Sequence, residues 1–216
     1  MMNRLLVNEN FHFVETTNST NLLLNEIVEK NVGKALSDFF CMFTNFQTAG
    51  KGQGSKSWQS NNGENILVSF YFKPHILPKQ QIYFNYFFAL TIRKTLSHYV
   101  SNVFIKKPND IYVNDKKIAG ILIEHHIQGE ILKYSIAGVG INVNQTNFDK
   151  SLTNPTSLQL LTAKNLSRQD ILEKIVHFGQ TYYNKLQKGA FMELEYEYEQ
   201  FVKTKSNLIT KENVNK

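Results

Sequence analysis

The sequence predicts a fold of the α/β (α+β) class, in which helices flank a β-sheet. The continuous apolar run at residues 66–72 is typical of a buried strand, and residues 111–143 contain three further strand-like segments. Residues 81–99 and 168–186 carry apolar side chains at helical spacing instead. The chain has 216 residues, 42% of them apolar and 19% charged, so it is long enough to form one well-buried globular domain.

The first third of the chain predicts a strand, a helix and two more strands. Residues 11–15 form the expected first strand, and the polar run at residues 16–21 offers capping groups for a helix that continues to Val28. Residues 39–46 are β-like and lead into the glycine-rich residues 50–54. We therefore expect a glycine-rich loop between two strands.

The rest of the chain predicts a helix, a β-meander and two closing helices. The helix at residues 81–99 follows Pro78. The expected strands are residues 111–113, 117–124 and 131–143, joined at the hairpin turns Asn114-Asp115 and Gln128-Gly129. The closing helices are residues 168–186 and 191–201. Residues 203–216 are polar and lack a core-forming pattern, so we expect a loosely held tail there.

Composition narrows the classes of partner. The formal charge is +6, but the basic residues are scattered, so we expect no DNA partner. The basic set contains only three arginines (Arg4, Arg93, Arg168) beside 21 lysines, so any anion site must use ammonium groups and backbone N–H donors. The single cysteine, Cys41, lies in an apolar run and predicts a buried thiol in a reducing, cytoplasmic setting. We expect neither a signal peptide nor a membrane-spanning helix, because the sequence shows no basic-then-apolar N-terminal pattern and no apolar run of membrane length.

The segment from Gln47 to Trp58 combines three glycines, two lysines and several hydroxyl groups, a composition that suits binding of a phosphate or carboxylate. A flexible surface hairpin tip is the alternative interpretation. A P-loop is rejected because Ser55 stands where its second glycine belongs and the segment runs into a strand. A dinucleotide-binding fingerprint fails as well, both here and at Gly138 and Gly140, where Val143 replaces the third glycine.

A protein-liganded metal site is not expected, because the six histidines show no ligand spacing with Cys41. The adjacent pair His125-His126 would point to opposite faces of a strand, so at most one of them could serve any one site. We interpret both as structural.

Four segments, in this order, make the chain similar to the catalytic domain of biotin–protein ligases. They are Ser19-Thr20-Asn21; residues 47–58; Lys106-Lys107-Pro108-Asn109-Asp110 with residues 116–124; and residues 138–143, Gly-Val-Gly-Ile-Asn-Val. The resemblance covers roughly residues 10–145. It implies a mixed β-sheet flanked by helices, as in class II aminoacyl-tRNA synthetases and biotin–lipoate ligases, and a requirement for ATP and Mg²⁺.

The resemblance also implies roles for the first two segments. Ser19, Thr20, Asn21 and Gln47 would bind the polar head of biotin, although Ser19 or Thr20 alone could equally cap the helix. In the family the glycine-rich loop folds over biotin and its adenylate. The residues assigned on this basis to biotin, to ATP or to both are Gly50, Lys51, Gly52, Gln53 and Trp58; plain core packing is the alternative for Trp58.

For the remaining segments the resemblance implies that Lys117 is the main catalytic group. An ammonium beside the reacting oxygens would reduce the repulsion between the biotin carboxylate and the α-phosphate. Lys51, Asp110 and Lys106 are the further catalytic candidates, with Lys106 expected near the Asp110 carboxylate. Solvated surface is the alternative for Lys117. The last assigned positions are Gly120, Gly138 and Gly140, where backbone would approach biotin, and Asn142, which suits the adenine edge.

The implied activity is transfer of biotin, through biotinyl-5'-AMP, to a lysine of a biotin carboxyl carrier domain of a carboxylase. Residues 1–202 would be the catalytic domain, in a monomer or a homodimer; the usual C-terminal β-barrel and the DNA-binding domain are expected to be absent. Two alternatives stay open: a lipoate or octanoate ligase or transferase, and a non-catalytic biotin sensor. The chain departs from the family at Lys107, where Trp is usual, and at Lys51 and Gln53, where Arg is usual. We therefore expect weaker retention of the adenylate.

Overall fold

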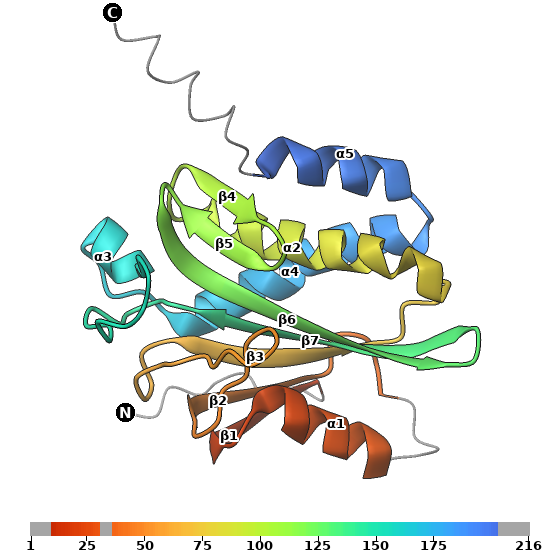
Figure 1. The fold of residues 1–216 in the computed structure, drawn as a ribbon, viewed down its shortest axis with the longest axis horizontal. Coiled ribbons are helices and arrows are strands. Elements are labelled where there is room, and N and C mark those ends of the chain that lie inside the picture. The colour runs from red at the N-terminus through yellow and green to blue at the C-terminus, as the bar shows by residue number, and fades with distance from the viewer. Residues whose placement is uncertain (1–9, 31–35, 203–216) are drawn as a thin grey trace, which may run out of the picture.

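The computed structural model describes residues 10–30 and 36–202, which build one seven-stranded mixed sheet in the order β1-β2-β3-β7-β6-β5-β4 (Figure 1). β1 and β2 are parallel, and the other neighbours are antiparallel. The strands are β1 (Phe11–Thr17), β2 (Cys41–Gln47), β3 (Ile66–Phe72), β4 (Val103–Lys106), β5 (Asp110–Val113), β6 (Lys116–Gln128) and β7 (Ile131–Ile141). The predicted fold class is confirmed.

The helices cover the two faces of the sheet unequally (Figure 1). On one face, α1 (Thr20–Lys30) packs against β2, β3 and β7; we call this the site face. On the other, the core face, α2 (Gln81–Leu96) packs with α4 (Arg168–Gln187) and α5 (Phe191–Phe201). The short helices are η1 (Pro78–Gln80) and α3 (Leu158–Thr162). The part of β5, β6 and β7 beyond α1 is therefore left open on the site face.

The core face holds the larger apolar cluster, because alternate residues of every central strand point into it. Phe72 is fully buried there, and its ring meets those of Phe39, Phe84 and Phe87 edge-on at centroid distances of 4.8, 5.4 and 5.4 Å. Cys41 belongs to the same cluster, and burial raises the pKa of its thiol to about 12. The prediction of a buried structural thiol is confirmed.

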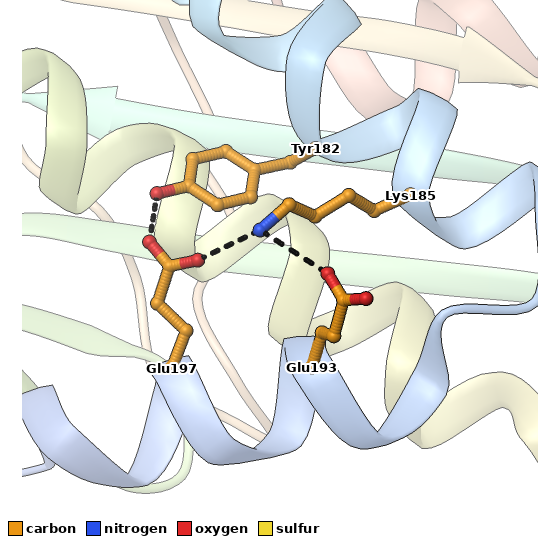
Figure 2. A network of polar contacts seen from close by, with 4 residues as sticks. All are labelled: Tyr182, Lys185, Glu193 and Glu197. Atoms are coloured by element: carbon orange, nitrogen blue, oxygen red, sulfur yellow. Dashed lines mark hydrogen bonds and ion pairs between the residues drawn. The ribbon is translucent and has the colours of Figure 1, made fainter.

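A polar network joins the last two helices (Figure 2). Tyr182 of α4 donates a hydrogen bond to Glu197 of α5, and burial together with this contact raises the pKa of Tyr182. The Lys185 ammonium of α4 lies 3.2 Å from the Glu197 carboxylate and 3.8 Å from that of Glu193. These partly buried contacts hold α5 against the core-face layer.

Several predicted boundaries change. The strand expected at residues 117–124 runs to Gln128, and the helix expected to reach residue 99 ends at Leu96. β4 and α3 were not predicted, because four- and five-residue elements carry too little periodicity. His125 and His126 face opposite sides of the sheet. His125 bonds to Asn85 of α2 on the core face. His126 stacks on Tyr134, which belongs to the smaller apolar cluster around Leu24 of α1. The predicted tail at residues 203–216 lies outside the described residues. Within the described ranges, none of the helices has both the length and the apolar character to cross a bilayer.

Candidate active site

A cavity of about 250 Å³ opens on the site face where α1 leaves the sheet uncovered. Its walls come from the start of α1, the end of β2, the glycine-rich loop, the turn between β4 and β5, and strands β6 and β7. The predicted site residues that line it are Ser19, Thr20, Asn21, Gln47, Lys51, Gly52, Gln53, Trp58, Lys106, Asp110, Lys117, Gly120, Gly138 and Gly140. Gly50 and Asn142 lie outside this lining.

The buried end of the cavity is polar and is formed by Ser19, Thr20, Asn21 and Gln47; we call it the polar end. Ser19, Thr20 and Asn21 are 2–4% exposed. Gln47 accepts a hydrogen bond at Oε1 from the backbone N–H of Thr20 at 2.8 Å, and the same oxygen lies 3.1 Å from the Thr20 hydroxyl oxygen. The backbone N–H groups of Ser19 and Thr20 are thus satisfied by Asn18 and Gln47 respectively.

Glycines form the floor of the cavity. A Cβ at Gly140 would lie 2.3 Å from Cε2 of Trp58, and one at Gly120 would lie 2.8 Å from its Cζ3. A Cβ at Gly138 would lie 2.2 Å from Oδ1 of Asn21. The indole therefore rests directly on backbone, as a wall of the cavity rather than as part of either apolar cluster of the sheet. Its Nε1 is buried and has no hydrogen-bond partner among the described residues.

The glycine-rich loop forms a small hairpin. Lys51 and Ser57 form an antiparallel bridge, Gly52 donates its N–H to the Lys56 carbonyl at 2.8 Å, and Trp58 donates to Gly50 at 2.9 Å. Two of the backbone N–H groups expected to converge on an anion are thus used inside the hairpin. Gly50 faces a neighbouring hollow, where a Cβ would meet the Trp58 carbonyl oxygen at 2.5 Å.

Lys117 reaches the cavity because the pairing of β5 with β6 shifts. Asp110 pairs with Gly120 and Ile111 with Ala119, but Tyr112 pairs with Lys117, so the register slips by one residue. Simple alternation from Gly120 would turn Lys117 toward the core face. The slip places it on the site face, with Nζ 2.7 Å from Oδ1 of Asp110 and 5.6 Å from the Trp58 ring centroid.

Backbone contacts from a distant segment fix Lys117 further. Its N–H donates to the Asn154 carbonyl at 2.8 Å, and its carbonyl accepts from Thr156 at 2.9 Å. Lys116, by contrast, is exposed. The ammonium of Lys117 is therefore carried by a braced strand rather than by a mobile loop.

The turn between β4 and β5 completes the rim. Asn109 donates from Nδ2 to the Ile121 carbonyl at 2.7 Å and accepts the Ile121 N–H at 2.8 Å. Lys106 pairs in register with Asp110 across β4 and β5, and its described ammonium contact is with the Tyr112 hydroxyl at 3.3 Å. Lys107 forms an ion pair with Glu199 of α5 at 2.7 Å.

The charge of the cavity is strongly one-sided. Five lysines line it against one carboxylate, that of Asp110; we call these lysines, Lys51, Lys56, Lys106, Lys107 and Lys117, the cationic mouth. In the described part of the chain, no group of three or more His, Cys, Asp or Glu side chains could hold a metal ion. A Mg²⁺ ion that arrives with nucleotide phosphates needs only one or two protein carboxylates, and Asp110 is placed to supply one.

Asn142, predicted to contact the adenine edge, lies outside the cavity lining. It is 4% exposed, and its Nδ2 donates to the Thr156 carbonyl at 2.9 Å. Its backbone N–H bonds to the Ile118 carbonyl. Its Oδ1 has no described partner. The side chain therefore anchors the segment that braces Lys117, with one acceptor left over.

Two polar residues behind the polar end, one fully buried and one half-buried, were not singled out from the sequence. Ser69 of β3 is fully buried, and its hydroxyl lies 2.7 Å from Thr20 Oγ1 and 2.5 Å from Asn21 Oδ1. Glu124 of β6 accepts a hydrogen bond from Asn21 Nδ2 at 2.7 Å. A serine inside an otherwise apolar buried strand was the available signal for the first.

The cavity thus combines a polar end, an aromatic wall over a glycine floor and a cationic mouth. Gly138 and Gly140, which underlie the polar end and the Trp58 wall, are two strand residues apart, or about 7 Å. The arrangement suits an elongated ligand with a hydrogen-bonding head and an anionic tail.

Known proteins resemble this chain in sequence. The biotin/lipoate A/B protein ligase family matches residues 13–142. The bifunctional ligase/repressor BirA of Bacillus subtilis (strain 168) is 31% identical over 134 residues, which cover 60% of this chain and 41% of that protein. The chain spans less than half the length of the curated relatives that it matches.

Solved structures share the fold. Biotin protein ligase from Aquifex aeolicus in complex with biotin and ATP superposes with a TM-score of 0.73 at 23% identity, covering 90% of this chain and 79% of that one. Biotin protein ligase from Leishmania major in complex with biotinyl-5-AMP gives 0.71 at 22% identity, covering 91% and 82%.

Proposed function

The chain belongs to the biotin/lipoate A/B protein ligase family, and from that premise we propose that it is an ATP-dependent biotin–protein ligase. It joins biotin to AMP and then transfers biotin to a lysine of an acceptor protein, for which a biotin carboxyl carrier domain is the expected partner. The neighbouring structures whose ligands are biotin with ATP, or biotinyl-5-AMP, support this choice.

The observation that carries the proposal is the polar end. Biotin has a ureido ring with two N–H donors and a carbonyl acceptor, whereas the lipoyl dithiolane ring and the octanoyl chain offer no N–H group. An apolar head at this end would leave the remaining hydrogen-bonding capacity of the buried Ser19 and Thr20 side chains unused, at a cost of about 0.5–1.5 kcal/mol for each hydrogen bond not made. The geometry therefore favours biotin over lipoate or octanoate.

In the first step a biotin carboxylate oxygen attacks the α-phosphorus of ATP, a new P–O bond forms, and the bond to pyrophosphate breaks. Two anions must approach each other, and the Lys117 ammonium, held on its braced strand, lies where it stabilises the charge that both share. Lys51 and Lys106 add positive charge from the cationic mouth. Asp110 would help to hold a Mg²⁺ ion, which would supply positive charge to the leaving pyrophosphate.

In the second step the acceptor amine attacks the acyl carbon, the C–N bond forms, and AMP leaves with the electrons of the C–O bond. The amine must lose a proton, and the Asp110 carboxylate, next to Lys117 at the mouth, orients the incoming ammonium and accepts that proton. Trp58 covers the acyl chain, and Gly52 lies beside it in the loop. The adenine lies toward Gln53 of the glycine-rich loop.

Biotin-dependent exchange of labelled pyrophosphate into ATP tests the first step, and label transfer from biotin to a carrier domain tests the second. Lys117→Ala is expected to lower the exchange rate by a factor on the order of 10²–10³, the usual loss when a preorganised donor is removed. The matched control is Lys116→Ala, the exposed neighbour. A full exchange rate in Lys117→Ala would contradict the assigned role, and exchange that depends on lipoate instead of biotin would contradict the proposed substrate.

A further inference from the structure

A chain of hydrogen bonds connects the polar end of the cavity to two residues that lie behind it. It passes from Glu124 to Asn21, from Asn21 to Ser69, and from Ser69 to Thr20. Only Asn21 and Thr20 line the cavity; Ser69 and Glu124 lie behind them. The distances along this chain, 2.7, 2.5 and 2.7 Å, are short enough that each contact requires a proton between its atoms.

The Glu124 carboxylate sets the orientation of the Asn21 amide. A carboxylate only accepts, so the NH₂ group of Asn21 must face Glu124, where the Leu122 carbonyl also accepts from it at 3.4 Å. The amide oxygen must then face Ser69. The amide lies directly on Gly138, where even a Cβ would stand 2.2 Å from Oδ1, so it is held in place.

The orientation of Asn21 determines where the two hydroxyl protons lie. The amide oxygen has no proton, so the 2.5 Å contact with Ser69 must contain the serine proton. The 2.7 Å contact between Ser69 and Thr20 must then contain the threonine proton. Gln47 Oε1 is already satisfied by the Thr20 N–H at 2.8 Å, and its 3.1 Å separation from the Thr20 hydroxyl is the longest of the set.

We propose that Ser69 and Glu124 are positioning residues that fix the Thr20 hydroxyl oxygen as a hydrogen-bond acceptor facing the cavity. With its proton directed at Ser69, Thr20 presents lone pairs to the ligand and cannot donate to it. This end therefore selects a ligand head with an N–H group. The inference rests on the proposed function, because the ureido ring of biotin supplies that N–H and lipoate does not.

A merely structural role for the same residues predicts a different result. If Glu124 only linked β6 to α1, its removal would lower the stability of the fold and the affinities for biotin and ATP together. If it sets the polarity of Thr20, its removal weakens biotin alone. The discriminating measurements are biotin affinity by calorimetry, the KM for ATP and kcat at saturating biotin from pyrophosphate exchange, and the unfolding midpoint in urea.

Ser69→Ala and Glu124→Ala are each expected to raise the Kd for biotin by roughly tenfold to a hundredfold, the effect of one lost or misdirected hydrogen bond in a buried site. The KM for ATP, kcat at saturating biotin and the unfolding midpoint should stay at wild-type values. The double variant should lose less than the product of the two single effects, because both act through Asn21. Glu124→Gln should recover most of the affinity, since its carbonyl oxygen can accept from Asn21.

The matched control is Glu130→Ala, which removes an exposed carboxylate from the turn of the same hairpin. It should leave biotin affinity unchanged. A ligand-side test needs no variant: biotin methylated at both ureido nitrogens should bind the wild-type protein at least about tenfold more weakly than biotin, and that gap should narrow in Ser69→Ala.

Equal binding of biotin and its methylated analogue by the wild-type protein would overturn the acceptor role of Thr20. So would wild-type biotin affinity in Glu124→Ala, or a parallel loss of biotin affinity, ATP affinity and stability. A wild-type protein that binds no biotin would instead overturn the proposed function, which keeps the two failures distinct.

Discussion

Strand β7 meets opposite demands on its two sides. Gly138 and Gly140 leave the site face bare, so that Asn21 and Trp58 rest directly on backbone. Val139 and Ile141, which alternate with them, fill the core face and are at most 4% exposed. Residues 138–141 thus form both an open cavity floor and part of a packed core. Substitutions on the core face should therefore lower stability, whereas substitutions on the site face should lower ligand affinity.

The core face should show the largest effect, in stability. Phe72→Ala removes the ring around which six other aromatic rings pack, and should lower the free energy of unfolding by about 3–5 kcal/mol. Urea denaturation measures the loss, and biotin affinity of the remaining folded protein should be unchanged. A loss below about 1 kcal/mol would mean that the surrounding side chains collapse into the space left by the ring.

The site face should show the next effect, in binding. A valine at Gly140 would place its Cβ 2.3 Å from the Trp58 indole, so the ring must leave the floor. Gly140→Val is expected to weaken biotin binding by about a hundredfold, or about 2.7 kcal/mol, with little change in the urea midpoint. Val139→Ala is the matched control one residue away, with stability lost and affinity kept. Equal effects of the two variants would contradict the division between the faces.

Low pH should lower the free energy of unfolding through His125, which lies on the core face. Burial, with a smaller contribution from neighbouring His126, lowers the pKa of His125 from 6.5 to about 4. Below pH 6.5 the unfolded chain binds a proton that the folded chain does not, so stability falls as pH drops from 6.5 to about 4. The loss should be about 1–2 kcal/mol, because the ring is partly solvated. His125→Gln should remove this part of the pH dependence in urea titrations, whereas exposed His177→Gln should leave it intact.

The smallest expected effect concerns the mouth. Lys51 gives a point charge where the family usually has the two-pronged guanidinium of arginine. Lys51→Arg should slow dissociation of biotinyl-adenylate by about tenfold or less, as measured by chasing labelled adenylate. Lys56→Arg on the same hairpin is the control. An unchanged dissociation rate in Lys51→Arg would show that the loop does not hold the phosphate.

The sequence predicted the residues of the site better than their geometry. The ordered segments around Thr20, Gln47, Asp110 and Lys117 line one cavity, because the strands and turns that carry them were recognised. Alternation alone would have turned Lys117 away. Its position depends on a register slip that two strands make only when paired, and no local pattern encodes such a slip.

Other features depend on contacts between distant segments. Ser69 and Glu124 matter through Asn21, which lies 48 and 103 residues from them in the chain. From the sequence we predicted that Asn142 contacts adenine. In the structure its amide donates to the Thr156 carbonyl, in a segment whose sequence carries no recognisable periodicity or motif. Hydrogen-bond partners far apart in sequence leave no periodic signal, so they could be found only in the structure.

The contact between Gln47 and the first turn of α1 binds local folding to ligand recognition. The amide oxygen of Gln47 caps the N-terminus of α1 by accepting the Thr20 N–H, while its NH₂ group faces Gly50 of the glycine-rich loop. The polar end therefore forms only when β2 and α1 are packed together, and it is absent when α1 is unfolded. Any replacement of Gln47 must meet two requirements at once, which leaves this position far less room to vary than a side chain that touches ligand alone.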